Sequence, residues 1–247
     1  MSDTALPFTL TEDRPAQLGL VVLQTDETIE MEFRRLLPPE AELLVTRIPS
    51  GEEVTPDSLG AMKHHLADAA RLLPQAARLS ALGYGCTSGA AEIGPSEVAR
   101  QLHGVTGAAA VTDPFTALVA ACRSLGVTRL GLLSPYIAEV SQRLRDRLAA
   151  EGIATPVFGS FETADEARVV RISEASIAEA ALALAERGGI DALFLSCTNL
   201  RTLNLIGGLE ATLGLPVLAS NPVLAWHMIR LSGLTPPPGA PGQIFRA

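Results

Sequence analysis

The chain has 247 residues and a formal net charge of −8, with 47% hydrophobic and 19% charged residues. This composition is typical of a globular protein with a well-filled core. The acidic balance and the lack of a basic stripe exclude a nucleic-acid-binding function. No apolar stretch is long enough to span a bilayer.

Hydrophobic periodicity predicts strands and helices that alternate along the whole chain. In the first half we expect strands at 18–23, 43–48, 79–84 and 108–112, and helices at 29–36, 56–73, 92–103 and 116–125. In the second half we expect strands at 129–133, 156–159, 192–195 and 216–219, and helices at 137–150, 172–187, 203–213 and 222–231. This alternation predicts parallel sheets with helices on both faces.

Three sequence echoes recur in the same order, 108 to 112 residues apart. LGLVV at 18–22 returns as LGLLS at 130–134, GCTS at 85–88 as SCTN at 196–199, and VTDP at 111–114 as ASNP at 219–222. The fold class is therefore α/β with two pseudo-symmetric halves, each a parallel sheet of about four strands, and an active site between them. We place the halves at 1–115, including a polar N-terminal arm over 1–16, and at 116–247, including an irregular C-terminal tail. A boundary near Leu125-Gly126 is the alternative.

Cysteine usage bounds the compartment and the metal chemistry. Cys86, Cys122 and Cys197 make an odd count, and the N-terminal residues show no signal-peptide pattern. We therefore expect free thiols in a reducing cytoplasm. No CxxC motif or Cys/His cluster is present, so we expect no metal site.

Cys86 and Cys197 are the candidate catalytic residues. Each follows a short apolar run, and a thiol just past a strand end lies where α/β folds bind ligands. Both precede stretches expected to be helical, and a helix N-terminus lowers the pKa of a thiol. Hydroxyl and amide groups beside them, together with backbone amides, form candidate pockets for a carboxylate. These substrate-binding candidates are Thr87, Ser88, Thr198 and Asn199.

Polar residues at the ends of other strands complete the candidate site. Tyr136 follows the first strand of the second half, and its hydroxyl is a candidate substrate contact. Asp26 holds the equivalent place in the first half, where it either binds substrate or caps the next helix. Asp113 and Asn221, each followed by proline, are interpreted as helix caps. Cys122 is expected to lie mid-helix as a packing residue.

These motifs resemble the Asp/Glu racemase superfamily over residues 18–231. The resemblance rests on GCTSGA at 85–90, SCTNLR at 196–201, TDET at 25–28 and SPY at 134–136. The most similar branch is the maleate cis–trans isomerases, with arylmalonate decarboxylases and ectoine-utilisation isomerase-like proteins nearby. It implies catalysis without cofactor or metal, in which Cys86 adds to a double bond and Cys197 is its acid/base partner.

The implied function is a cofactor-independent isomerase that acts on a small carboxylate. The first alternative is an amino-acid racemase or epimerase, or an ectoine-derivative isomerase, which would use the same two thiols. An alternative of another class is a non-catalytic small-molecule binding protein. The resemblance implies a small carboxylate or amino-acid substrate and no nucleic-acid or membrane partner, and it leaves a homo-oligomer open.

Two positions depart from the maleate isomerase pattern. Asp26 stands where those enzymes have asparagine, and no asparagine is found near Ala167, where a second one is expected. An anion beside a substrate carboxylate is repulsive unless it is protonated or paired. Both departures therefore favour a substrate that carries a nitrogen.

Overall fold

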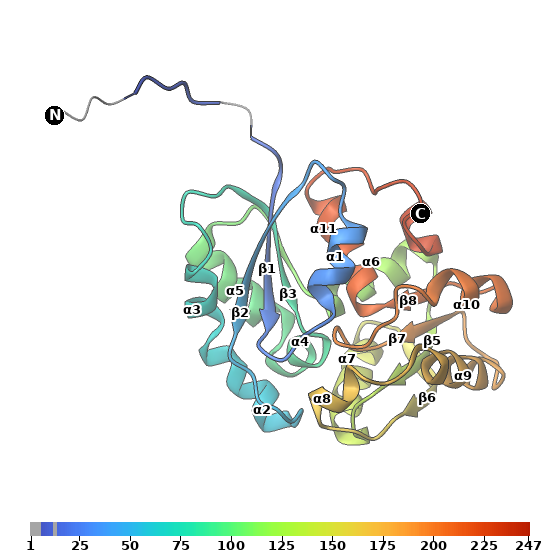
Figure 1. The fold of residues 1–247 in the computed structure, drawn as a ribbon. Coiled ribbons are helices and arrows are strands. Elements are labelled where there is room, and N and C mark those ends of the chain that lie inside the picture. The colour runs from blue at the N-terminus through green and yellow to red at the C-terminus, as the bar shows by residue number, and fades with distance from the viewer. Residues whose placement is uncertain (1–5, 12–13) are drawn as a thin grey trace.

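The computed structural model describes residues 6–11 and 14–247. It contains two four-stranded parallel sheets with the same strand order, β2-β1-β3-β4 and β6-β5-β7-β8. Figure 1 shows the first sheet in blue to green and the second in yellow to orange. The identical order confirms the two similar α/β halves expected from the sequence echoes.

The elements follow the predicted alternation. The first half contains β1 (Gln17–Leu23), α1 (Ile29–Leu36), β2 (Glu42–Ile48), α2 (Pro56–Ala61), η1 (Met62–His64), α3 (Leu66–Arg71), β3 (Leu79–Gly85), α4 (Thr87–Ile93), α5 (Pro95–Thr106), β4 (Val111–Thr112) and α6 (Pro114–Leu125). The second contains β5 (Arg129–Ser134), α7 (Ala138–Ala150), β6 (Ala154–Ser160), α8 (Glu166–Val169), α9 (Glu174–Ala185), β7 (Ala192–Leu195), α10 (Ile206–Leu213), β8 (Val217–Ala219), α11 (Ser220–Leu231) and η2 (Gln243–Arg246).

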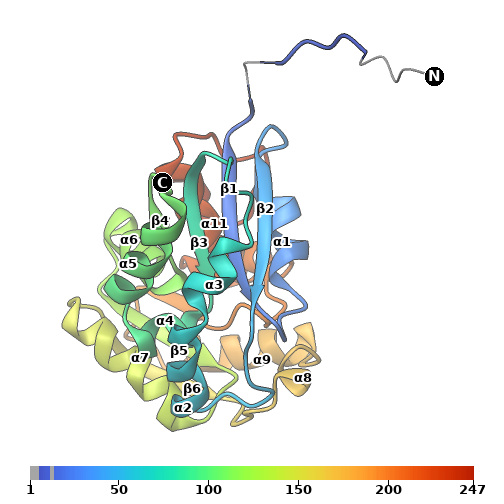
Figure 2. The same cartoon turned by 90° about the vertical axis from the view of Figure 1, so that its left-hand side faces the viewer.

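Strand β1 is buried on both faces, as a central parallel strand must be. Leu18, Leu20 and Val22 belong to one apolar cluster, which also contains residues of α1 and α11. Val21 and Leu23 belong to the other cluster, with residues of α3 and α5. Figure 2 shows α3 and α5 in front of this sheet, with α1 and α11 behind it. The period-two alternation therefore separates two helical layers.

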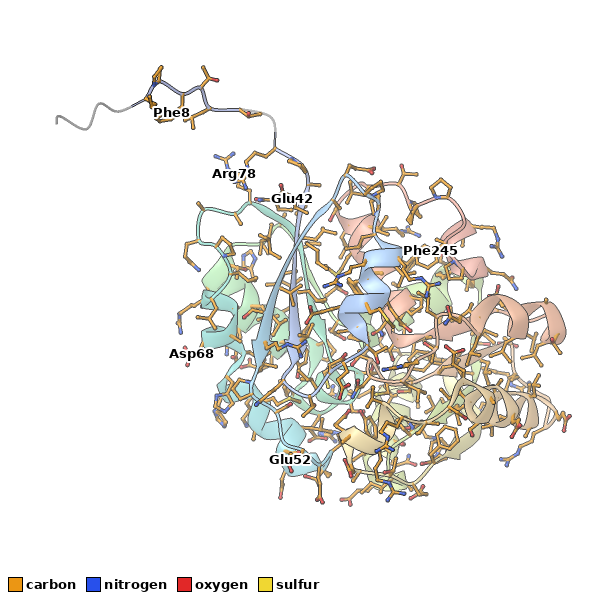
Figure 3. All side chains as sticks on the ribbon, in the orientation of Figure 1. Phe8, Glu42, Glu52, Asp68, Arg78 and Phe245 are labelled. Atoms are coloured by element: carbon orange, nitrogen blue, oxygen red, sulfur yellow. The ribbon has the colours of Figure 1, made fainter. Side chains whose placement is uncertain are left out.

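Helix α11, from the end of the chain, packs on the sheet of the first half rather than on its own. It lies against β3 so closely that a Cβ at Gly83 would stand 2.7 Å from Met228 Sδ. Figure 1 shows red α11 beside blue α1, and Figure 3 places Phe245 of the tail beside α1. The two halves therefore share their cores, and the boundary expected between residues 115 and 116 stays a prediction.

Several predicted elements are shorter or more divided than expected. The helix expected at 56–73 is three pieces, α2, η1 and α3. The helix expected at 92–103 starts earlier, as α4, and is broken at Gly94, whose φ of +100° no helix accommodates; α5 begins at Pro95, which lacks an amide hydrogen. The strand expected at 108–112 is regular only over Val111–Thr112, although Ala109 and Ala110 also form backbone hydrogen bonds with β3.

The second half holds two further differences. The helix expected at 203–213 begins only at Ile206, so the residues after Cys197 form turns instead of a helical first turn. The short helix α8 was not expected at all. Both differences lie beside the candidate site, and they change how that site is built.

The N-terminal arm lies partly outside the described residues. Of its described part, Leu6, Phe8 and Leu10 are each more than 80% exposed, so this segment is less polar than expected. Figure 3 shows Phe8 standing away from both halves. Within 6–11 and 14–247, no helix is both long enough and apolar enough for a membrane span.

Asp113 caps α6, as predicted, and a substitution tests the cap. Its Oδ1 accepts the Thr116 backbone amide at 2.9 Å, and its Oδ2 accepts the Thr116 hydroxyl at 2.7 Å. We expect Asp113→Ala to lower the free energy of unfolding by about 1–2 kcal/mol, because a lost cap leaves a helix amide unpaired. Asp113→Asn retains an acceptor and should recover most of the loss. Urea unfolding measures both, and equal stability of wild type and Asp113→Ala would contradict the cap.

Candidate active site

The ends of the two central strand pairs bring the predicted residues together. In the first sheet β2 lies on one side of β1, and β4 lies on the opposite side of β3, so the strand order reverses between β1 and β3. The second sheet reverses in the same way between β5 and β7, and each of these places is a topological switch point. Ligands bind α/β sheets at such points, outside the carboxyl ends of the strands. Asp26 follows β1, Cys86 follows β3, Tyr136 follows β5 and Cys197 follows β7.

Cys86 is the N-cap of α4. Its Sγ accepts the backbone amide of Gly89 at 3.1 Å, as a cap oxygen would, and its side chain is buried. Gly89 is required here, because a Cβ would stand 2.9 Å from Cys86 Sγ and 2.6 Å from the Tyr84 hydroxyl. The first turn of α4 also leaves the amides of Thr87 and Ser88 without helical partners. A thiol and free amides therefore share one helix terminus.

Cys197 is held differently from its counterpart. Its φ is +126°, a left-handed conformation that costs a non-glycine residue free energy and that marks functional sites when it is observed. The surrounding groups fix this conformation: the Cys197 amide donates to Ser220 Oγ at 2.9 Å, and the Asn199 amide donates to Cys197 Sγ at 3.2 Å. The sequence predicted a helix N-terminus at both thiols, and this expectation is wrong for Cys197.

Hydrogen bonds join the two cysteine turns directly. Ser220, fully buried at the start of α11, accepts from both: the Thr87 hydroxyl lies 2.7 Å and the Cys197 amide 2.9 Å from its Oγ. The Thr198 hydroxyl donates to the carbonyl of Gly85 at 3.2 Å. The turns therefore belong to one site between the halves. Ser220 carried no sequence signal, because only packing of α11 across the molecule brings it there.

Tyr136 lies inside this site and connects Cys197 to a carboxyl group. Its hydroxyl is 3.0 Å from Cys197 Sγ and 2.6 Å from Glu166 Oε1. Asn199 Nδ2 donates to Glu166 Oε2 at 2.7 Å. All four side chains are at most 5% exposed. Sequence reasoning missed Glu166: the family pattern has an asparagine near Ala167, and only its absence from this chain was noted.

Asp26 is both a cap and an unpaired acid. Its Oδ1 accepts the amides of Thr28 and Ile29, each at 2.8 Å, and so begins α1. Its Oδ2 is buried and accepts no hydrogen bond among the described residues: the nearby Thr198 hydroxyl acts to lower the Asp26 pKa but donates to the Gly85 carbonyl instead. The two interpretations of Asp26 therefore do not exclude each other, because one oxygen caps the helix while the other is free to bind a ligand.

Asn221 does not cap α11, contrary to the sequence interpretation. The helix begins one residue earlier, at Ser220, and Asn221 Nδ2 donates to Glu32 Oε2 and to the Thr198 carbonyl, both at 2.8 Å. Glu32 Oε1 accepts the amides of Thr202 and Leu203. Asn221 therefore ties α1 to the second cysteine turn.

Burial dominates the electrostatics of the site. Burial raises the pKa of the Cys86 thiol to about 12, although the Gly89 amide acts in the opposite direction. Burial raises the pKa of Cys197 as well, and the nearby Glu166 carboxyl adds to the rise. The pKa of Glu166 and that of Asp26 are also raised, first by burial. The lowered thiol pKa expected from helix termini is therefore outweighed by desolvation.

Two backbone hydrogen bonds join the halves next to Glu166. The Val54 amide donates to the Ala164 carbonyl at 2.8 Å, and the Glu166 amide donates to the Glu52 carbonyl at 3.1 Å. Figure 3 shows Glu52 at the outer edge of the first half, beside α2. These two bonds join a loop of the first half to the start of α8, and so fix where Glu166 enters the interior.

Comparison with known proteins places this fold and its cysteine turns in a family. A family model described as arylmalonate decarboxylase matches residues 52–245. A maleate isomerase of Nocardia farcinica is 30% identical over 243 residues, 93% of this chain and 95% of that protein. An arylmalonate decarboxylase of Bordetella bronchiseptica is 29% identical over 222 residues, 87% of this chain and 90% of that protein.

A solved structure extends the likeness. It is a Nocardia farcinica maleate cis–trans isomerase, in a cysteine-to-serine form with a covalently bound succinylcysteine intermediate, and its TM-score is 0.81 at 28% identity. The alignment covers 94% of this chain and 98% of that one. The class is thus an α/β protein of two similar halves with paired cysteine turns. The chain belongs to the arylmalonate decarboxylase family, and the resemblance to this branch is confirmed.

Stability as a function of pH tests the charge of Asp26. Burial raises its pKa above the ordinary value of 3.8, so the folded protein holds this proton more tightly than the unfolded chain. The stability that depends on the proton is present at low pH and is lost as the pH rises through the folded pKa. An asparagine in this position would cap α1 without a charge, so Asp26→Asn should raise the free energy of unfolding at neutral pH, with a gain that shrinks below pH 3.8.

Urea unfolding over a pH series measures this difference. Asp57→Asn, at an exposed aspartate, is the matched control and should show no such pH-dependent gain. An Asp26→Asn protein that is less stable than wild type at every pH would contradict the expectation.

Proposed function

We propose that this chain is a cofactor-independent isomerase that acts on a small carboxylate through Cys86 and Cys197. One observation carries the proposal: two buried thiols stand on turns that are hydrogen-bonded to each other through Ser220, at the switch points of both sheets. A two-sided reaction at one carbon or one double bond needs groups fixed in this way from opposite halves. The succinylcysteine carried by a relative supports a thiol as the reacting group.

The substrate carboxylate is proposed to lie on the cysteine turns. The amides of Thr87 and Ser88, in the first turn of α4, point past the end of a helix, where anions are stabilised. Thr198 and Asn199 line the opposite turn. Negative charge that develops on the carboxylate during the reaction would be stabilised by these fixed donors.

The proposed mechanism has two steps. The Cys86 sulfur adds to one carbon of the double bond, which forms a C–S bond and moves the π electrons toward the carboxylate. Rotation about the resulting single bond and expulsion of the Cys86 thiolate then restore the double bond in the other geometry. Cys197 serves as the acid/base partner: it takes the proton of the Cys86 thiol as the C–S bond forms and returns it after Cys86 is expelled. No electrons are gained or lost overall.

A second candidate function is isomerisation or racemisation of a substrate that carries nitrogen. The unpaired Oδ2 of Asp26 and the buried carboxyl of Glu166 support it. No Lys, Arg or His of the described residues forms an ion pair with either group. A buried carboxylate without a cation is costly, and a substrate ammonium would supply one.

The cysteines provide the first test. We expect Cys86→Ser to abolish turnover, because the sulfur that bonds to carbon is lost, and Cys197→Ser to lower it by at least about 10²- to 10⁴-fold, the usual contribution of a positioned acid or base. Cys122→Ser, buried in α6 away from the strand ends, is the control and should keep turnover. Two active single variants would contradict the two-thiol mechanism.

Solvent deuterium separates the candidate functions. A panel of small unsaturated acids and amino acids is incubated in D₂O and followed by NMR. Racemisation must place deuterium at the α-carbon, whereas thiol addition and elimination need not. If the wild type converts neither class of compound, catalysis is contradicted, and a non-catalytic small-molecule binding protein is the remaining alternative.

Asp26→Asn tests the nature of the substrate. If the substrate carries nitrogen, the change should cost about 1.5–3 kcal/mol of binding free energy, the value of a hydrogen bond to a charged group. If it is a dicarboxylate, the same change should raise kcat/KM for maleate, because a repulsive charge is removed. Steady-state kinetics on both substrate classes measure the effect. Unchanged kinetics on both would restrict Asp26 to capping.

The compartment and the assembly belong to the proposal as well. Cys86, Cys122 and Cys197 are all free and buried, which fits a reducing cytoplasm. A small carboxylate or amino acid is the proposed partner, and a homo-oligomer remains a prediction.

A further inference from the structure

A continuous hydrogen-bonded chain leads from one of the two thiols to a carboxyl group. It runs from Cys197 Sγ to the Tyr136 hydroxyl over 3.0 Å, and from there to Glu166 Oε1 over 2.6 Å. Every member is at most 5% exposed, so bulk water does not compete for these bonds. Tyr136 has one hydroxyl hydrogen, so it donates to one neighbour and accepts from the other.

Asn199 fixes how the far end of this chain is used. Its Oδ1 accepts the Glu27 backbone amide at 2.9 Å, so its Nδ2 faces Glu166 Oε2 and donates to it at 2.7 Å. Oε2 is therefore an acceptor, and a proton on Glu166 belongs on Oε1, toward Tyr136. The chain then has two fully hydrogen-bonded arrangements, one with a thiol and a carboxylate, the other with a thiolate and a carboxylic acid.

Cys86 has no equivalent route for its proton. Its Sγ accepts the Gly89 amide and lies beside the Tyr84 hydroxyl, whose hydrogen bonding acts to lower the Cys86 pKa against the larger effect of burial. That hydroxyl donates to Met62 Sδ at 3.6 Å rather than to an acid. Among 6–11 and 14–247, no hydrogen bond connects Cys86 or Tyr84 to a carboxyl group. The two thiols are therefore chemically unequal, although the two halves share one topology.

We propose that Glu166, acting through Tyr136, accepts the proton of Cys197, so that in the free protein Cys197 is the thiol that ionises while Cys86 keeps its proton. The S–H bond of Cys197 breaks as an O–H bond forms on Tyr136, and the original O–H bond of Tyr136 breaks as one forms on Glu166 Oε1. One proton moves, Tyr136 is unchanged, and the pair keeps a single negative charge throughout. Glu166 is thus a positioning residue for the proton of Cys197.

The electrostatic surroundings agree with a shared proton. Besides Tyr136 and Cys197, the titratable groups that face Glu166 include Asp26, Asp165 and the Cys86 thiol, all of which are negative when ionised. Burial and these like charges raise the pKa of Glu166, and burial raises that of Cys197. A second negative charge is thus opposed, whereas movement of one proton within the pair adds none. Such coupled groups titrate as a pair rather than singly.

A shared proton has a measurable signature. The pair loses its two protons in two steps, and between these steps it holds one proton. The thiolate fraction at Cys197 is then set by how Cys197 and Glu166 share that proton, so it does not change with pH. For a thiol without this partner, at a pH below its pKa, the thiolate fraction rises about tenfold for each unit by which the pH is raised. The inference rests on the same site as the proposed function, but this signature needs no substrate, so the two fail independently.

The experiment is alkylation of the full chain by iodoacetamide, at concentrations where the rate is proportional to reagent. Peptide mass mapping follows Cys197 and Cys86 separately from about pH 6 to about pH 8, where thiolate governs the rate. In the wild type the Cys197 rate should be flat across this range. In Glu166→Gln and in Tyr136→Phe it should rise about tenfold per pH unit. Thiolate absorbance at 240 nm, compared with Cys197→Ser, measures the same fraction without reagent access.

The control separates proton transfer from a structural role. Glu162→Gln, at an exposed acid four residues from Glu166, should keep the flat profile. A mere loss of negative charge or of packing in Glu166→Gln would change the rate at every pH but not the slope. A wild-type Cys197 rate that rises as steeply as that of Glu166→Gln, or a Cys86 rate that is flat instead, would overturn the inference.

Discussion

Buried carboxyl groups without an ion-pair partner are the constraint on which this site depends. Asp26, Glu32 and Glu166 converge with two thiols between the halves, and in the described part of the chain none of these carboxyls forms an ion pair. Taking a carboxylate out of water is costly unless donors replace the water. Backbone amides and two asparagine side chains therefore donate hydrogen bonds to these acids. The number of hydrogen bonds that each carboxyl group accepts indicates its role.

The three acids are satisfied to different degrees. Both oxygens of Glu32 accept hydrogen bonds, from two backbone amides and from Asn221, so its charge is used to hold α1 against the second cysteine turn. Glu166 shares its oxygens between Tyr136 and Asn199. Asp26 leaves Oδ2 without a partner. An unsatisfied buried oxygen is rare in folded proteins and calls for an explanation, and the proposed substrate nitrogen would provide one.

The sequence predicted the features that are encoded locally. Strand β1 and its echo β5 are apolar runs whose periodicity does not depend on the rest of the fold, and the repeat order revealed the duplication. Because parallel strands expose their carboxyl ends at one edge, the positions after β1, β3, β5 and β7 could be expected to meet. Asp26, Cys86, Tyr136 and Cys197 were found in this way.

Residues that reach the site through tertiary packing could not be predicted from local sequence patterns. Ser220 bridges the cysteine turns only because α11 crosses to the other sheet. Glu166 enters the interior from a four-residue helix, held by backbone bonds to a loop more than a hundred residues earlier in the chain. The break at Gly94 is different, because the Gly94-Pro95 pair is a local helix-breaking signal that the sequence did contain.

Pseudo-symmetry places the two thiols alike, but the segments that come after β3 and β7 make them different. After β3 the chain turns directly into α4, so Cys86 becomes a helix cap bonded to an amide. After β7 it passes through turns, with Cys197 in a left-handed conformation that directs its sulfur to Tyr136. The proposed addition and elimination asks different things of the two thiols, because Cys86 forms and breaks a bond to carbon while Cys197 exchanges a proton. The different segments after β3 and β7 fit this proposed division, since only Cys197 is hydrogen-bonded to a tyrosine that also contacts a buried carboxyl group.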